Sequence, residues 1–389
     1  MKRKIIYIIC YLAYSSIYIA RVNLTMANPS LVANGVLSTV QIGILGTVFS
    51  AMFASGRLIN GILSDRVPPW IMISGGLALC SLGNILIGFF PPFVGILLLW
   101  TVNAYAQSML WGSMISIMSD IYDESTAKKR TAMLSTSVAT GNIISILFCT
   151  WFITVLGVEY AFIVPGIITL VLGFAVMIAA KDVKIHSREK KRSSSISLLK
   201  NKELCIMSIP AFIHGILKEN ISLWMAMYVT YVYAIDISES AYYLLLIPAF
   251  GFVGRVVHQV FYRLFKENEH AVSVLGFVLS IVFSLMLVIA RPSVLYSVGC
   301  LTAIYASVSM INTSFLSVYP HNFRKEGNVS SVSGIIDFVT YLGASFGALV
   351  YGYMIEYIGY DSMFISWAAV SLVGTIIIYK FVNIRGKKQ

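Results

Sequence analysis

The sequence predicts an all-α membrane protein with twelve transmembrane helices in two six-helix halves. Three observations support this: the composition, a regular series of apolar runs, and an internal repeat that carries buried charge. The chain of 389 residues is 58% hydrophobic and only 12% charged, whereas a soluble chain is typically about 25% charged. The net charge of +11 does not indicate nucleic-acid binding, because the Lys and Arg residues lie in short segments between apolar runs.

Twelve runs are long enough to cross a bilayer, which takes about 20 mostly apolar residues per helix. Six of them precede a polar stretch and six follow it: 5–30, 40–64, 70–91, 94–119, 131–156, 160–180, 205–232, 240–264, 271–290, 294–318, 329–355 and 361–383. The first run follows basic residues, as in a secretory signal. It continues without a small-residue cleavage site, so we expect a retained helix.

The polar stretch divides the chain into three parts. We expect residues 1–180 to form the first bundle, 181–204 a cytoplasmic linker, and 205–389 the second bundle. The linker carries eight basic and three acidic residues. It is too polar to insert into lipid and too short for a domain, and such basic segments favour anionic lipid surfaces.

The basic residues also predict the orientation. With the N-terminus in the cytoplasm, 23 of the 28 Lys and Arg residues fall in cytoplasmic segments, and only Arg291 is exterior. An excess of basic residues marks the cytoplasmic side of a membrane protein. We therefore expect a multi-pass plasma-membrane protein, monomeric, with both termini in the cytoplasm.

The two halves share an internal repeat. Arg21 and Asn23 in the first span correspond to Lys218 and Asn220 in the seventh, at an offset of 197 positions. Gly56-Arg57 and Gly254-Arg255 correspond at an offset of 198. A charge near the centre of a membrane helix costs roughly 2.5–3.5 kcal/mol on insertion scales, so its repetition favours a functional site. Halves of like orientation are a known plan of transporters.

The motifs resemble those of a known family. Gly61-Ile62-Leu63-Ser64-Asp65-Arg66 resembles the Gly-x-x-x-Asp-Arg signature of the major facilitator superfamily. Further segments resemble the organophosphate:phosphate antiporter family within it, which includes the glycerol-phosphate and hexose-phosphate transporters: Tyr18–Asn23, Ala27-Asn28-Pro29, Gln107–Trp111 and Tyr341-Leu342-Gly343. The resemblance implies the major facilitator fold, a central site between two halves and transport by alternating access.

The chain departs from that family at three positions. Ile213 stands where the seventh span carries an Arg that helps hold phosphate, and Lys218 lies about one and a half turns further along. Thr140 replaces a cavity His, and Val22 replaces a second basic residue. The resemblance therefore implies the fold and mechanism but leaves the phosphate substrate open.

Two cations are the leading substrate-binding candidates. Arg21 and Lys218 fall near the middle of their spans, where an Arg fork and a Lys point charge suit an anion. The alternative is that each is neutralised inside the protein, for example Lys218 by Glu219 or Asp337. Further polar and aromatic candidates for contact with substrate can equally serve interhelical packing: Asn23, Asn220, Gln107, Trp111 and Tyr341.

Glu219 and Asp337 are the only acids deep in the predicted spans. A buried carboxylate can carry a proton, which favours proton coupling at these residues. The alternative is a structural ion pair. Adjacent helical residues point about 100° apart, so we expect Glu219 not to pair with Lys218.

A second set of residues is predicted to control gating. In the superfamily, the cytoplasmic ends of the second and fifth spans latch the two halves, and Asp65 can accept hydrogen bonds from a helix N-terminus or an Arg. The gating candidates are Arg57, Gly61, Asp65, Arg66 and Arg130. The alternative is that they anchor the topology alone.

The sequence thus predicts a secondary active transporter for a small organic anion such as a sugar phosphate, phosphonate or carboxylate. Phosphate or a proton is the expected coupling ion. The alternative is a proton-coupled exporter of drugs or metabolites on the same fold. The sequence carries no nucleophile–base set and no metal-ligand spacing, so we expect no enzymatic activity, no cofactor and no metal.

Overall fold

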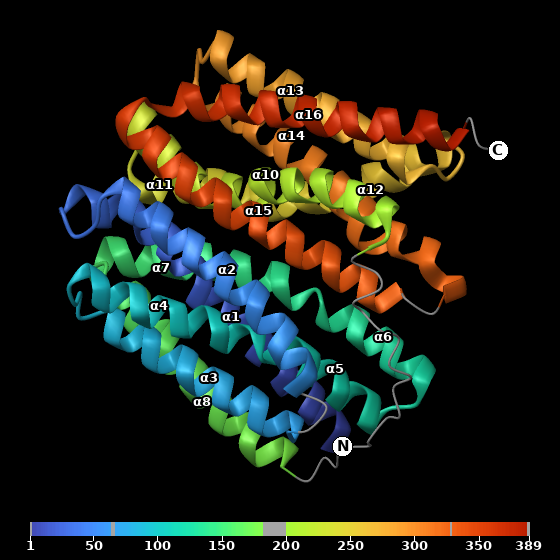
Figure 1. Ribbon diagram of the computed structural model, residues 1–389. Helices are drawn as coiled ribbons and strands as arrows, with labels where there is room; N and C mark the ends of the chain where they lie inside the picture. The colour runs from blue at the N-terminus through green and yellow to red at the C-terminus, as the bar shows by residue number, and fades with distance from the viewer. Residues whose placement is uncertain (1, 64–66, 182–199, 327–328, 387–389) are drawn as a thin grey trace. The chain divides into compact units, whose positions relative to one another are not determined.

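The computed structural model describes residues 2–63, 67–181, 200–326 and 329–386 (Figure 1). Within these ranges, twelve helical segments are long and apolar enough to cross a membrane, which confirms the predicted number of spans. They are Arg3–Ala33, Thr39–Asn60, Pro69–Ile87, Phe93–Ile121, Ser137–Val155, Tyr160–Ala180, Lys202–Tyr233, Ile237–Leu264, Glu269–Ile289, Val294–Phe323, Ser331–Tyr357 and Tyr360–Lys380.

The chain forms two compact units. Unit 1 comprises Met1–Glu189 together with Asp236–Tyr242, and unit 2 comprises Lys190–Ile235 and Tyr243–Gln389. The first part of α11 therefore groups with unit 1, which the division predicted from the sequence did not anticipate. Most of the expected linker, residues 182–199, lies outside the described residues.

Unit 1 is built from eight helices, and its principal pairs are α3 with α8, α1 with α7 and α8, and α2 with α4 (Figure 1). The helices are α1 (Lys2–Ala33), α2 (Thr39–Leu63), α3 (Pro69–Ile87), α4 (Phe93–Ser108), α5 (Leu110–Ile121), α6 (Glu124–Leu134), α7 (Ser137–Val155) and α8 (Tyr160–Ala180).

Unit 2 repeats the same pattern of pairs, with α10 against α15, α13 against α16 and α12 against α14. Its elements are α10 (Lys202–Tyr233), α12 (Leu246–Leu264), α13 (Glu269–Ile289), α14 (Val294–Thr313), the π-helix η1 (Ser314–Val318), the 3₁₀ segment η2 (Tyr319–Glu326), α15 (Val329–Tyr357) and α16 (Tyr360–Gly386), while α11 (Ile237–Leu244) is shared between the units.

Several spans are interrupted in ways that hydropathy does not reveal. The fourth span breaks at Met109 between α4 and α5, and the eighth breaks at Leu245 between α11 and α12. The tenth ends in η1, a π-helix. The run expected at 131–156 begins in α6, and its membrane helix α7 starts only at Ser137.

Side-chain caps begin several helices at the membrane boundaries. The Asn201 side chain accepts a hydrogen bond from the Leu204 amide at 3.1 Å and thereby starts α10. Asn268 accepts from the His270 and Ala271 amides, both at 3.0 Å, at the start of α13. Such caps satisfy amide groups that have no partner within the helix, so they fix where the spans of unit 2 start.

The internal repeat is present in the helix crossings. In unit 1, Gly141 of α7 lies against the Ser15 carbonyl of α1, and in unit 2 Gly343 of α15 lies against the Phe212 carbonyl of α10. Ser15 and Phe212 differ by 197 positions, the offset of the Arg21–Lys218 pair. Small residues allow this close approach of backbones in membrane helices. Glycine thus serves close packing of helices at both crossings.

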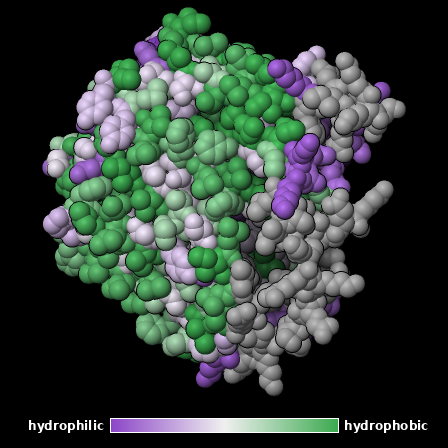
Figure 2. Space-filling model, viewed as in Figure 1, coloured by the Kyte–Doolittle hydropathy of each residue, from purple (hydrophilic) through white to green (hydrophobic). Residues whose placement is uncertain are grey.

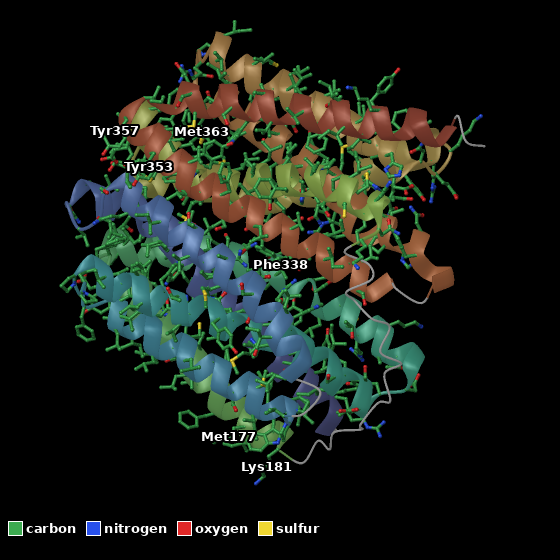
Figure 3. All side chains as sticks on the ribbon, viewed as in Figure 1. Met177, Lys181, Phe338, Tyr353, Tyr357 and Met363 are labelled. Atoms are coloured by element: carbon green, nitrogen blue, oxygen red, sulfur yellow. The ribbon has the colours of Figure 1, made fainter. Side chains whose placement is uncertain are left out.

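The outer surfaces are apolar, as lipid contact requires. Exposed side chains include Trp151 at 53%, Phe174 at 56% and Ile289 at 83%. Figure 2 shows hydrophobic side chains over much of the visible face. Figure 3 shows Tyr353 and Tyr357 at one end of α15, and their rings stack at 6.2 Å with Tyr357 75% exposed. Aromatic residues in such places mark the membrane–water boundary.

Candidate substrate-binding site

Arg21 lies on α1 beside aromatic side chains of α2. Its Cζ atom is 4.6 Å from the ring centroid of Phe49 and 5.1 Å from that of Phe53. A guanidinium over an aromatic face is attracted by the negative charge of the ring face. This contact helps to hold a cation within an apolar span.

Arg57 lies against the same ring. Its Cζ atom is 4.9 Å from the centroid of Phe53, so two guanidinium groups contact one buried phenyl ring. The sequence placed Arg57 among the gating residues. That role stays a prediction. In the structure Arg57 lies about one helical turn after Phe53 on α2, so it reaches the ring that Arg21 also contacts.

The aromatic contacts fix the orientation of both cations. Stacking uses the flat face of a guanidinium, whereas its N–H donors lie in the plane at the edge. Arg21 and Arg57 can therefore keep these contacts while they direct N–H groups to an anion. Two planar forks on one surface suit a carboxylate or phosphate group, which accepts several charge-assisted hydrogen bonds.

A layer of buried amides lies directly behind Arg21. Asn23 Nδ2 donates to Asn84 Oδ1 at 2.8 Å and to the Ala161 carbonyl at 3.0 Å. The Ala20 carbonyl accepts from Asn84 Nδ2 at 3.4 Å, from Asn103 Nδ2 at 3.2 Å and from Gln107 Nε2 at 3.5 Å. These side chains link α1, α3, α4 and α8 around the residue that precedes Arg21.

The amide layer includes two of the substrate-binding candidates from the sequence. Asn23 is fully buried, and Gln107 is only 2% exposed. Both were considered as partners for substrate hydroxyl groups, and the structure engages both in hydrogen bonds between helices. Buried amides require such partners in a membrane protein, where no water is at hand to satisfy them.

Two further positions in unit 1 pack against tyrosines of α1. Trp111, expected to line the floor of a cavity, lies 5.0 Å from the ring of Tyr14. Thr140, at the position of the family's cavity His, has its hydroxyl 2.8 Å from that of Tyr11. A threonine here joins α7 to α1 and brings no positive charge.

In unit 2, Lys218 forms an ion pair with Glu219. The Nζ and Oε1 atoms are 3.3 Å apart, and each side chain is 24% exposed. The expectation that adjacent residues would not pair is wrong. The two side chains leave the helix in different directions, but both are long and flexible enough for their ends to meet beside the helix.

The charge of Lys218 also interacts with residues of other helices. It interacts electrostatically with Asp337 and Tyr341 of α15 and with Tyr305 of α14. The Tyr305 hydroxyl bonds to Ser222 of α10 and interacts with Arg255 of α12. Unit 2 thus gathers one further basic residue, two acids and two tyrosines around Lys218.

Tyr305 is a member of this cluster that the sequence did not reveal. Gly251 lies beneath its ring, where a Cβ atom would come within 3.0 Å of Cε1. Gly251 and Gly254 lie about one turn apart in an apolar span, and this spacing could have indicated from the sequence that another helix packs closely there. Such glycines mark a close approach of another helix, here α14 with its tyrosine.

Asn220 follows its repeat partner Asn23. It is 1% exposed, and its Nδ2 donates to the Ile216 carbonyl at 2.9 Å and to the Ala344 carbonyl of α15 at 3.3 Å. The structure thus engages it between helices, the alternative that the sequence left open, and its contact with substrate stays a prediction. Tyr341, 8% exposed, remains a candidate because it lies near Lys218.

The remaining gating candidates are only partly described. The Cζ atom of Arg130 lies 4.9 Å from the Tyr7 ring and 5.8 Å from the Tyr122 ring. Gly61 falls in α2, whereas Asp65 and Arg66 lie outside the described residues. In the part of the chain that is described, no group of three His, Cys, Asp or Glu side chains could hold a metal ion.

Comparison with known proteins places these features in a family. The Major Facilitator Superfamily matches residues 10–348. The phosphoglycerate transporter protein of Salmonella typhimurium is 21% identical over 90% of this chain and 82% of its own. A probable hexose phosphate transport protein of Chlamydia trachomatis is 25% identical over 44% of this chain, and the match covers 38% of that relative. The membrane sensor protein UhpC of Escherichia coli is 35% identical over 28% of this chain and 25% of its own.

Solved structures agree on the fold. The nucleoside transporter NupG superposes with a TM-score of 0.83 at 12% identity, covering 96% of this chain and 99% of that one. A bacterial homologue of the lysosomal transporter Spinster superposes with a TM-score of 0.76 at 14% identity, covering 98% and 94%. At these identities the likeness shows the arrangement of helices alone.

Proposed function

The chain belongs to the Major Facilitator Superfamily, and on that premise we propose that it is a secondary active transporter of a small organic anion. Its two six-helix units would expose the site alternately to the two sides of the plasma membrane. The match to the hexose phosphate relative spans well under half of that protein. Transport by this chain is therefore stated as a proposal.

The observation that carries the proposal is the pair of guanidiniums on Phe53. Arg21 and Arg57 contact that ring at 5.1 and 4.9 Å from its centroid. Two fixed Arg forks favour a dianionic group, and the phosphate esters named for the relatives carry one. We therefore propose a phosphate ester of a sugar or a glycerate as substrate, and Lys218 and Tyr341 as the candidate ligands within unit 2.

Transport requires that substrate bind the alternative states differently. A ligand shifts an equilibrium only by its differential affinity for the two conformations. A substrate anion that interacts with Arg21 and Arg57 more strongly in one state than in the other would supply that difference. The substrate anion would thereby promote the change of state that moves it.

Uptake into proteoliposomes tests the proposal. The purified protein is reconstituted and given radiolabelled glycerol 3-phosphate, a hexose phosphate and a phosphoglycerate in turn. We expect uptake of at least one of them and its loss in Arg21→Ala. Arg291→Ala is the control, since this Arg pairs with Asp361 at the start of α16. Wild-type uptake by Arg21→Ala would overturn the role given to that residue.

The same experiment separates two other functions. A sensor is favoured by the 35% identity to UhpC over part of the chain. A sensor would bind a phosphate ester, as seen by a thermal shift, without moving it across the vesicle membrane. A proton-coupled drug exporter would move apolar cations instead, which the two arginines at Phe53 disfavour.

A further inference from the structure

Lys218, which the proposed function makes a substrate ligand, already forms an ion pair with the carboxylate of Glu219. Lys218 Nζ and Glu219 Oε1 are 3.3 Å apart, and both side chains are three-quarters buried. A substrate anion cannot approach Lys218 closely while the carboxylate remains charged beside it. At this depth repulsion between two anions is much stronger than it is in water.

We propose that the chain is a proton symporter, in which Glu219 takes up a proton when a substrate anion replaces its carboxylate on Lys218. This rests on the proposed function, and it assigns the coupling ion. The proton comes from water on the side from which substrate enters and forms an O–H bond on Glu219. It leaves on the opposite side when the substrate is released and the Lys218–Glu219 pair forms again.

Charge balance favours this exchange of partners. Before loading, the positive Lys218 and the negative Glu219 sum to zero. An anion that took Lys218 would remove from the buried Glu219 carboxylate the positive charge with which it pairs, which is destabilising. Uptake of one proton by Glu219 offsets one unit of the negative charge that the substrate brings to Lys218. Glu219 then remains as a neutral acid that can donate a hydrogen bond.

The groups around the pair point to Glu219 as the proton carrier. Asp337 and Tyr341 of α15, Tyr305 of α14 and His214 of α10 all interact with Lys218. His214 is fully buried, and its protonated form would repel Lys218. Asp337 also acts on Lys218, and Glu219 lies 3.3 Å from its Nζ atom, so Glu219 is the acid that we assign to the exchange.

Charged and titratable groups on the other packed helices have other partners. Arg255 of α12 interacts with Tyr305. From α16, the Tyr360 ring lies 5.2 Å from that of Tyr228, and Asp361 pairs with Arg291. An exchange of partners on Lys218 therefore involves Glu219 before any of these groups.

Proteoliposomes with an imposed pH gradient test the proposal. With the exterior acidic, we expect wild-type protein to accumulate a labelled phosphate ester above its equilibrium level. Glu219→Gln should lose accumulation but keep exchange of labelled for unlabelled substrate, because its amide is neutral throughout. Asp361→Asn is the matched control and should keep accumulation, because Asp361 pairs with Arg291 and is not part of the cluster around Lys218. Loss of accumulation in Asp337→Asn but not in Glu219→Gln would overturn the assignment.

A binding measurement tests the proposal even if the Glu219→Gln variant does not transport substrate. Affinity for glycerol 3-phosphate is measured in detergent between pH 7.5 and 8.5, above the second pKa of about 6 of a phosphate ester. Uptake of one proton predicts an affinity that falls about tenfold for each unit of rising pH. The slope should vanish in Glu219→Gln, and an unchanged slope there would refute the proposal.

The failure of this inference is distinct from failure of the proposed function. Wild-type protein that exchanges phosphate esters but ignores the pH gradient would overturn proton symport and leave anion transport standing. Wild-type protein that moves none of the phosphate esters would overturn the proposed function itself. Counterflow against inorganic phosphate is measured in parallel, since such exchange without a pH effect would identify phosphate as the coupling ion.

Discussion

Phe53 shows how a single apolar residue can organise charge inside a membrane helix bundle. It is 3% exposed, and the guanidiniums of Arg21 and Arg57 both contact its ring. The two arginines come from different helices, and the ring joins them into one cationic surface. A phenyl ring achieves this without adding a counter-charge, so both cations keep their attraction for an anion.

Replacement of Arg57 tests this surface. We expect Arg57→Ala to weaken binding of a phosphate ester by tenfold or more, because a hydrogen bond to a charged group contributes about 1.5–3 kcal/mol. Arg57→Lys should retain part of the affinity as a point charge. Thermal shift against substrate concentration measures both.

The control for Arg57 is a basic residue away from Phe53. Lys129 is exposed on α6, and Lys129→Ala should leave affinity unchanged. If Arg57→Ala also bound normally while Asp65 variants failed to transport, the residue would return to the gating role that the sequence suggested.

At the scale of single elements, α1 owes its position to the amides behind it. Three side-chain amides converge on the Ala20 carbonyl, and the Leu24 amide donates to Asn23 Oδ1 at 2.9 Å. These bonds flank Arg21 on both sides. The layer therefore fixes the height and rotation of the helix at the point where its cation must be presented.

Asn84 is the centre of this layer and the residue to replace. Asn84→Ala removes the side-chain acceptor of one Asn23 N–H and a donor to the Ala20 carbonyl, at about 1–3 kcal/mol for a buried group. We expect a lower unfolding temperature in detergent and reduced substrate affinity. Ser74→Ala on the same helix is the control, because Ser74 bonds only within α3, to the Trp70 carbonyl at 2.6 Å and to Ile71. Equal losses in both variants would contradict the special role of the layer.

The crossing of α10 with α15 depends on glycine in the same way. A Cβ atom at Gly343 would overlap the Phe212 carbonyl, whereas one at Gly334 on the same helix would meet nothing within 4 Å. Gly343→Ala should therefore destabilise the protein by about 1–3 kcal/mol, the usual range for overpacking. Gly334→Ala should be neutral or slightly stabilising, since alanine favours helix. Thermal unfolding of the two variants in detergent makes the comparison, and a stable Gly343→Ala would show that the helices can separate at no cost.

At the scale of the whole molecule, the basic residues predict which side of the membrane each loop faces. Asp236 and Lys129 are both exposed, and by this rule they lie on the exterior and cytoplasmic sides. In a Cys205→Ser background, a membrane-impermeant maleimide applied to intact cells should label Asp236→Cys and spare Lys129→Cys. Cys205 is replaced because it is the exposed native cysteine. The opposite labelling pattern would invert the topology.

Much of the architecture follows from the sequence itself. The number of spans, their approximate limits and the two repeated halves could be read from apolar runs and basic residues, because the bilayer imposes length, polarity and charge bias directly on the chain. The same constraint singled out Arg21 and Lys218 as candidate functional residues, because a charge within an apolar span is recognisable without knowledge of its neighbours.

The tertiary structure alone decided what each of these residues touches. Arg57 belongs with Arg21 because both reach Phe53, and Asn23 serves its neighbouring helices because Asn84 and Ala161 lie within hydrogen-bond distance. The pairing of Lys218 with Glu219 depended on the paths of two flexible side chains, which helical periodicity does not determine. Insertion into lipid depends on each segment separately, so the sequence records it. The chemistry of a site depends on side chains from several helices at once, and only their packing brings those side chains together.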